Sequence, residues 1–160
     1  MSRAPSAFQV RLAGPADVDA FVLQRVAIFA ETQGLEPGPR REAFERSTRA
    51  AYQDLVPRAA ALVWLAEDAT GAAIGSCALH RLDRFPSLSN PVAFEGYVSH
   101  VWVAPAWRRR GVGSALVKAL AAEARARGFT RVRLHATEEG RALYATLGFR
   151  LRSNDMELVL

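Results

Sequence analysis

The chain has 160 residues, of which 50% are apolar and 23% charged, a balance that predicts one folded domain spanning residues 1–160 and excludes a disordered chain. The formal net charge is +5, and every basic residue except Lys118 is an arginine, which favours a mildly basic solvated surface over a nucleic-acid-binding one. Cys77 is the only cysteine, which excludes an intramolecular disulfide and a cysteine-rich metal site.

The N-terminal half predicts alternating strands and helices separated by loops. Alternation of Phe8, Val10 and Leu12 with polar residues is typical of a half-buried strand. A cluster of glycine and proline within residues 31–41 indicates a loop between two helices. The predicted elements are a strand over 8–12, a helix from about 17 to 29, a weaker helix over about 41–55, and strands over 61–66 and 72–79.

The C-terminal half contains the clearest predicted helix. Val112, Leu116 and Leu120 recur at helical spacing, and Gly128 ends the helix. The predicted elements are a strand over about 95–103, this helix over about 112–127, a strand over 132–136, a short helix over 139–147, and two short strands within 149–160. The order β-α-α-β-β-β-α-β-α-β-β predicts an α/β fold in which helices cover a mixed sheet.

The segment that joins the strand before residue 104 to the helix after residue 111 predicts a phosphate-binding loop. It contains Arg108, Arg109 and Arg110, followed by glycines at 111 and 113. The first N–H groups of a helix have no partner within the helix, and its dipole makes that end positive. Glycines let an anion approach the backbone, and arginines add donors shaped for phosphate oxygens.

Two better-known phosphate loops are excluded by spacing. The Gly-x-x-x-x-Gly-Lys-Ser/Thr pattern of nucleoside-triphosphate loops is absent, and the Gly-x-Gly-x-x-Gly dinucleotide pattern fails because residue 116 is Leu. What remains is Arg-x-x-Gly-x-Gly between a strand and a strong helix.

Two segments resemble motifs of the GNAT superfamily of N-acetyltransferases. Residues 103–116 read Val-Ala-Pro-x-x-Arg-x-x-Gly-x-Gly-x-Ala-Leu, which is similar to the acetyl-CoA-binding motif of that family. Downstream, residues 143–149 read Leu-Tyr-x-x-x-Gly-Phe, which resembles a second family motif. The predicted order of elements extends the resemblance over nearly the whole chain, so a GNAT-like fold is expected.

The resemblance implies how acetyl-CoA would be held. Backbone groups of Val101 and Val103 would pair with the pantetheine arm, the arginine–glycine loop with Ser114 would hold the pyrophosphate, and Tyr144 would act as general acid toward the departing sulfur. The implied cofactor-binding residues are Val101, Trp102, Val103, Arg108, Arg109, Arg110, Gly111, Val112, Gly113 and Ser114.

The general base is left open by the sequence. Many family members carry a glutamate six residues before the valine of the first motif, and here that residue is Tyr97. Glu95 and His100 are the candidate bases nearby, with Glu95, Tyr97 and Val101 expected on one face of the strand and His100 on the other unless a bulge shifts the alternation. Alternatively, the substrate amine binds already neutral.

The resemblance therefore predicts an enzyme that moves the acetyl group of acetyl-CoA to a primary amine of a small molecule or peptide by direct attack. The alternative is a non-catalytic acyl-CoA-binding module that senses the cofactor. The acceptor is not determined. The family usually builds its acceptor pocket from loops that correspond to residues 31–41 and 82–93, and Glu31, Glu36 and Glu42 are acidic residues near the first loop.

The protein's location and partners are predicted mainly from sequence features that it lacks. The N-terminal residues lack the apolar stretch of a signal peptide, and no stretch approaches the ~18 apolar residues of a membrane span, so a cytoplasmic protein without membrane or nucleic-acid partners is expected. His80, His100 and His135 are scattered, which predicts no metal site. Residues 156–160 are a candidate for strand pairing across a homodimer.

Overall fold

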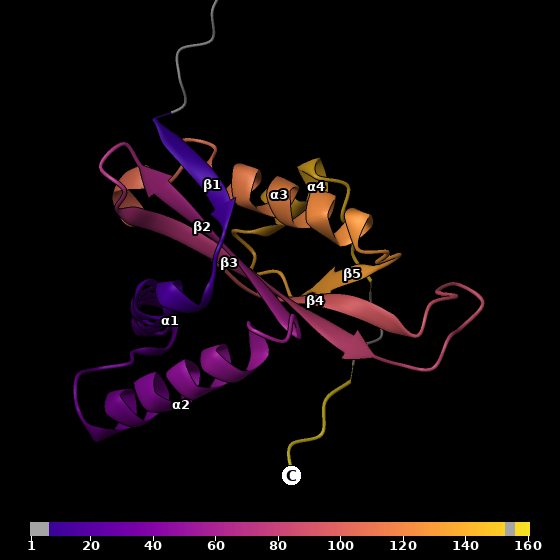
Figure 1. Cartoon of the computed structure of the whole chain (residues 1–160), viewed down its shortest axis with the longest axis horizontal. Coiled ribbons are helices and arrows are strands. Elements are labelled where there is room, and N and C mark those ends of the chain that lie inside the picture. Colours follow the sequence, from indigo (N-terminus) through magenta and orange to yellow (C-terminus); the bar gives the residue numbers. More distant parts are fainter. Residues whose placement is uncertain (1–6, 153–155) are drawn as a thin grey trace, which may run out of the picture.

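The computed structural model describes residues 7–152 and 156–160, and its helices and strands follow the predicted order from residue 8 to residue 146 (Figure 1). The elements are β1 (Phe8–Leu12), a 3-10 turn η1 (Pro15–Asp17), α1 (Val18–Gln33), α2 (Pro39–Leu55), β2 (Ala61–Asp68), β3 (Ala73–Asp83), β4 (Phe94–Val103), a 3-10 turn η2 (Pro105–Trp107), α3 (Val112–Ala126), β5 (Val132–Leu134) and α4 (Arg141–Thr146).

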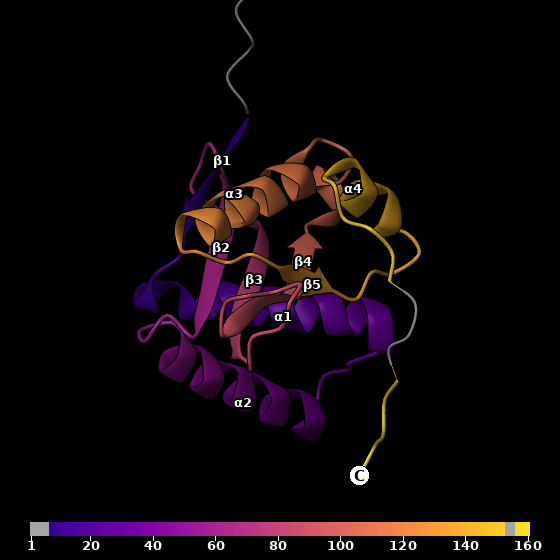
Figure 2. The same cartoon turned by 90° about the vertical axis from the view of Figure 1, so that its right-hand side faces the viewer.

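The strands form one sheet in the order β1-β2-β3-β4-β5. The first four are antiparallel neighbours, whereas β4 and β5 are parallel, which confirms the mixed sheet. Helices α1 and α2 lie on one side of the sheet, and α3 and α4 lie on the other (Figures 1 and 2).

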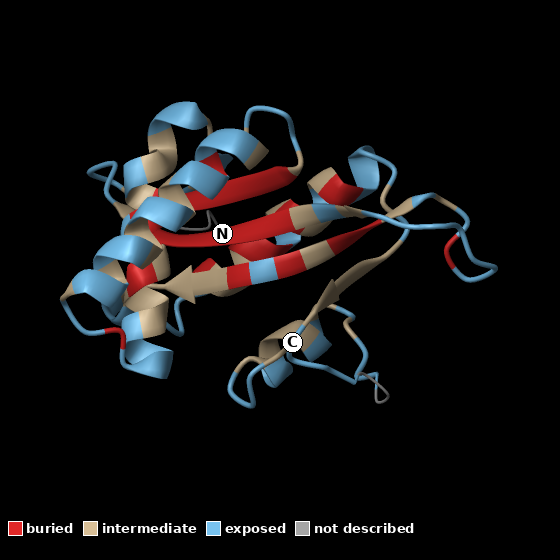
Figure 3. Cartoon of the chain, turned by 90° about the horizontal axis from the view of Figure 1, so that it is seen from below, coloured by how far each residue is buried: buried red, intermediate tan, exposed pale blue. Residues whose placement is uncertain are grey.

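Each face of the sheet has its own apolar core. Under α3, side chains such as Leu79, Leu116 and Leu120 are at most 1% exposed. Under α1 and α2, a second cluster includes Phe21 and Leu65. Figure 3 shows the result: the central strands are buried, whereas the outward faces of the helices are exposed.

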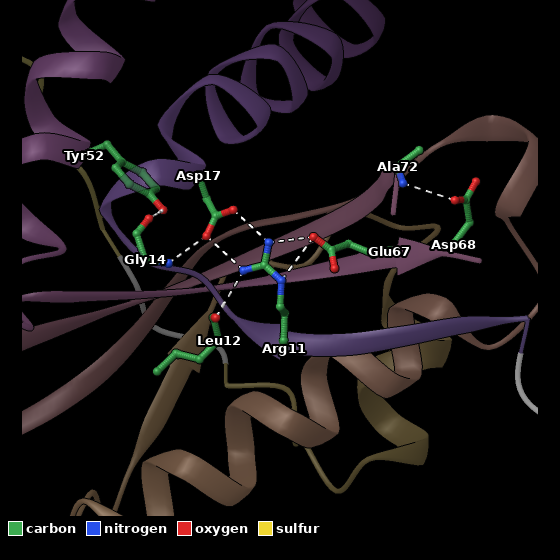
Figure 4. A network of polar contacts seen from close by, with 8 residues as sticks. All are labelled: Arg11, Leu12, Gly14, Asp17, Tyr52, Glu67, Asp68 and Ala72. Atoms are coloured by element: carbon green, nitrogen blue, oxygen red, sulfur yellow. Dashed lines mark hydrogen bonds and ion pairs between the residues drawn. The ribbon is translucent and has the colours of Figure 1, made fainter. Parts of the chain in front are cut away.

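A polar network fixes the start of α1 and the end of α2 to the sheet (Figure 4). Arg11 of β1 forms ion pairs with Asp17 at 2.8 Å and with Glu67 of β2 at 2.6 Å. Its guanidinium lowers the pKa of Asp17. The hydroxyl of Tyr52 in α2 donates to the carbonyl of Gly14 at 2.8 Å. Both helices are therefore anchored against the same face of the sheet.

A bulge interrupts β4 at Ser99. Ala78 of β3 pairs with His100 and Leu79 pairs with Val98, so Ser99 is the extra residue. Beyond it the alternation is shifted: Val101 packs against the core on the α3 side, while the ring of His100 contacts Phe21 on the α1 side at 5.2 Å. Val101 and His100 therefore lie on the opposite faces from those expected of an uninterrupted strand, because the bulge shifts the alternation.

The same bulge determines which backbone groups of β4 face β5. Gly96 donates to Arg131 at 2.9 Å, on the β5 side, whereas Ala104 donates to Ile74, toward β3, at 2.8 Å. Because alternate residues of a strand direct their backbone groups to the same neighbour, Val101 and Val103 direct theirs away from β3. The last pair of β4 and β5 is Val98 with Leu134, so these groups lie along an edge that β5 does not cover.

Other differences from the predicted elements lie at their ends. Helix α1 continues to Gln33 and ends at Gly34, which has a φ of 62°. Helix α2 begins at Pro39 because proline suits the first helical position, so the predicted loop is shortened to residues 34–38.

The two strands predicted within 149–160 do not form in the described residues of that segment, and residues 153–155 lie outside the described part. Met156, Leu158 and Leu160 are more than 80% exposed, so they have no sheet to pair with and no apolar surface to pack against. Pairing of this segment across a homodimer remains a proposal. No described helix is long and apolar enough to cross a membrane.

Candidate functional site

Helix α3 begins beside the uncovered edge of β4 without a side-chain cap. The chain leaves β4 through η2, where Trp107 donates to Ala104 at 2.8 Å, and then turns through Arg109 and Gly111, which have φ values of 61° and 84°. The positive φ accounts for glycine at 111. Since no side chain satisfies the first-turn N–H groups of α3, they are available to an anionic ligand.

Packing within the protein does not explain Gly113. A Cβ at this position would lie 3.4 Å from Leu143 Cδ2 and 3.8 Å from Val103 Cγ2, which are ordinary contacts. Its φ is not in the left-handed region either. A glycine that neither backbone strain nor packing requires, at the start of an uncapped helix, is suited to the close approach of a ligand.

The three arginines of the loop are not equivalent. Arg108 donates from Nε to the carbonyl of Val103 at 2.9 Å and pairs with Glu31 of α1 at 2.6 Å. Glu31 also accepts a hydrogen bond from Trp102 Nε1 at 3.1 Å. Arg108 therefore holds the loop to β4 and α1, and would contact phosphate only if its pair with Glu31 opened.

The other two arginines, Arg109 and Arg110, are exposed. Arg110 lies over the ring of Trp107, with 5.3 Å from its guanidinium carbon to the ring centre. These two side chains, with the N–H groups of α3, form the positive surface next to the edge of β4. The residues present therefore fit a pyrophosphate group, with Arg109 and Arg110 as its cationic partners.

Tyr144 lies on α4, with its ring centre 5.7 Å from that of Phe149. Its hydroxyl makes no hydrogen bond with another described residue. Burial, and secondarily the proximity of Cys77, raise the pKa of this phenol. Helix α4 lies beside the start of α3, because a Cβ at Gly113 would be 3.4 Å from Leu143 Cδ2, the residue before Tyr144.

The two candidate bases are both buried. His100 is 3% exposed, and its Nε2 lies 2.7 Å from Ser76 Oγ. Burial, followed by the charge of Arg25, lowers the pKa of His100 to about 3, so it is neutral near pH 7. Glu95 is 2% exposed and lies between Arg84, at 2.7 Å, and Arg133, at 3.6 Å. These surroundings fit structural roles better than proton exchange with a substrate.

Comparisons with known proteins agree with this geometry. The model of the acetyltransferase (GNAT) family matches residues 27–149. The chain belongs to the GNAT family.

Among its relatives is glucosamine 6-phosphate N-acetyltransferase of Trypanosoma brucei brucei, which is 33% identical over 91 residues. That match spans 57% of this chain and 60% of the relative's length. Similar solved structures include a GCN5-related N-acetyltransferase from Ralstonia eutropha JMP134, with a TM-score of 0.82, 26% identity and coverage of 95% and 98% of the two chains. A predicted acetyltransferase with acetyl-CoA from Clostridium acetobutylicum has a TM-score of 0.84 at 22% identity, with coverage of 95% and 96%.

In this GNAT domain, Tyr97 is joined to His135, a contact that sequence reasoning missed. Tyr97 Oη and His135 Nδ1 are 2.6 Å apart, and the two residues connect β4 to the end of β5 next to the last strand pair. The sequence contained part of the information needed to predict this contact. In a parallel register that pairs Tyr97 with Arg133, His135 follows two residues later and lies close to Tyr97. Among the described residues, no group of three histidine, cysteine or acidic side chains is placed to hold a metal ion.

We predict that Gly113→Val weakens acetyl-CoA binding at least about tenfold while the ligand-free protein still folds, because a branched side chain beside the uncapped first-turn N–H groups of α3 should hinder the close approach of the phosphates. Thermal melts with increasing acetyl-CoA report the affinity, since ligand stabilisation grows with concentration.

S-acetyl pantetheine, which lacks the pyrophosphate, serves as the matched ligand. It should bind weakly and similarly to both proteins. Equal acetyl-CoA stabilisation of the variant and the wild type would contradict the assignment of the loop.

Proposed function

We propose that this GNAT protein transfers the acetyl group of acetyl-CoA to a primary amine of a small molecule or peptide by direct attack. The observation that carries the proposal is the adjacency of three features: the uncapped start of α3, the backbone edge of β4 that β5 leaves uncovered, and α4, which carries Tyr144 and whose Leu143 lies next to Gly113. A strand edge suits an extended amide-containing arm, and a helix N-terminus suits its phosphates.

Acetyl-CoA supplies an activated thioester. In the transfer, the amine nitrogen forms a bond to the acetyl carbon, the carbon–sulfur bond breaks, and the amine loses a proton. Tyr144 would donate a hydrogen bond to the departing sulfur. A phenol ordinarily has a pKa of about 10 and a thiol about 8.5, and burial raises that of Tyr144 further, so complete proton transfer to the thiolate is uphill. Its role is therefore to stabilise negative charge on sulfur.

The amine must reach the thioester unprotonated. Glu95 and His100 are buried and engaged with neighbouring side chains, so neither is placed to take a proton from a bound amine. We therefore expect the amine to bind largely neutral. The burial of both candidate bases also favours one alternative, a non-catalytic module that binds acyl-CoA.

The experiment that separates these functions mixes the protein with acetyl-CoA and a panel of amino acids, polyamines, amino sugars and peptides, and follows the release of free thiol. Amine-dependent thiol release supports the enzyme. Thermal stabilisation by acetyl-CoA without thiol release from any amine would support the module, and absence of both would contradict each proposal.

We predict that Tyr144→Phe lowers the turnover number about 100-fold, because hydrogen bonding to the leaving group lies at the small end of acid–base effects, and leaves acetyl-CoA affinity nearly unchanged. Phenylalanine keeps the ring contact with Phe149. Turnover with an acceptor from the panel and acetyl-CoA binding are measured separately. Unchanged turnover would assign Tyr144 a packing role, and a loss of affinity alone would make it a binding residue.

A further inference from the structure

A cavity of about 230 Å³ lies between helices α1 and α2 and the sheet. Its walls are mainly apolar, with Phe44 and Leu55 on the helix side and Val63 and Ala78 on the strand side. This volume far exceeds the ~30 Å³ share of one water molecule and approaches the lower end of small-ligand pockets, about 300 Å³. An apolar group of a few carbon atoms fits such a space.

One end of the cavity is polar and carries a cation that no acidic side chain neutralises. Arg25 of α1 lines the cavity, with its guanidinium carbon 4.8 Å from the centre of the Phe29 ring and Nη1 3.5 Å from the carbonyl of Ser99. Within the described part of the chain it has no ion pair, and burial alone lowers its pKa. A desolvated cation of this kind is stabilised by an anion.

The described side chains around Arg25 supply no anion to neutralise it, so a ligand could do so. His80 Nε2 lies 2.7 Å from Ser99 Oγ, and burial, followed by the charge of Arg25, lowers the pKa of both His80 and His100. This end of the cavity therefore carries a positive charge, and none of the described residues that line the cavity is a carboxylate.

The polar end of the cavity lies at the bulge, where β4 stops pairing with β5. Ser99 is exposed, lines the cavity, and follows Val98, the last residue of β4 that pairs with β5. A ligand whose carboxylate met Arg25 would have an α-amino group within two bonds of that carboxylate, close to Ser99. The burial that lowers the pKa of the neighbouring histidines would also lower that of an ammonium group there, which favours the neutral amine.

We propose that the acceptor is a free α-amino acid with an apolar side chain, bound with its carboxylate on Arg25, its side chain in the cavity and its amine at Ser99. This inference rests on the proposed function. In the reaction, a nitrogen–carbon bond forms to the acetyl group, the carbon–sulfur bond of acetyl-CoA breaks, and the one proton lost by the neutral amine balances the one gained by the departing sulfur. The products are an N-acetyl amino acid and free coenzyme A.

The test measures binding by calorimetry in the presence of coenzyme A, so that it does not depend on turnover. L-Leucine is compared with L-leucinamide, which has the same side chain and amine but no carboxylate. The wild-type chain should bind leucine about 10- to 100-fold more tightly, because hydrogen bonds to a charged group supply that ratio. Arg25→Met keeps an apolar side chain near Phe29 and should abolish the discrimination.

A second variant tests the cavity itself. Ala51 lines it from α2, and Ala51→Phe should fill the apolar part, weakening leucine binding at least about tenfold while L-alanine binds as before. Equal wild-type affinity for leucine and leucinamide, discrimination that persists in Arg25→Met, or unchanged leucine binding by Ala51→Phe would each overturn the inference. Thiol release from other amines without leucine binding would overturn it and leave the proposed function standing. Discriminating binding without thiol release from any amine would contradict the proposed function and the role of the amino acid as acceptor, and would leave only an amino-acid-binding site.

Discussion

The single extra residue in β4, Ser99, is the constraint on which the candidate site depends. Before it, the backbone groups of Gly96 and Val98 are directed toward β5. After it, those of Val101 and Val103 are directed to the same side, where β5 has already ended. An uninterrupted strand would present His100 and Trp102 there instead. The bulge thus combines a continuous sheet with a strand edge that β5 does not cover and that leads to the start of α3.

The bulge also separates two chemical environments. Val101 packs on the α3 side, and the ring of His100 packs on Phe21 on the other side. On the α3 side, exposed arginines and the helix N-terminus form a positive surface suited to phosphates. On the α1 side, a largely apolar cavity with one partly buried cation, Arg25, adjoins Ser99. Helix α1 contacts both environments, because it carries Arg25 at the cavity and Glu31 at Arg108.

The sequence was sufficient for the features that depend on local patterns. The spacing of arginines and glycines after Pro105 and the second motif at Tyr144 predicted the family, and apolar periodicity predicted each element up to α4 within a few residues. These features are determined by residues near one another in the chain, through helix periodicity, strand alternation and glycine backbone conformations.

The rest depends on contacts between distant residues. The bulge at Ser99 is determined by its register with β3, and the engagement of Arg108 by Glu31 needs the packing of α1 against the end of β4. The burial of Glu95 between two arginines and the cavity beside Arg25 also arise only when elements assemble. The two strands predicted within 149–160 are features that the sequence predicted and the described residues do not form. An alternating apolar segment forms no strand without a neighbouring strand edge to pair with.

The most direct test of the account is amide hydrogen exchange measured residue by residue with and without acetyl-CoA. His100 and Trp102 direct their amides toward β3 and should exchange slowly in both states. Val101 and Val103 should become protected only when acetyl-CoA is bound, because the pantetheine arm would then pair with the uncovered edge of β4. Bound acetyl-CoA that leaves the amides of Val101 and Val103 unprotected would contradict the account.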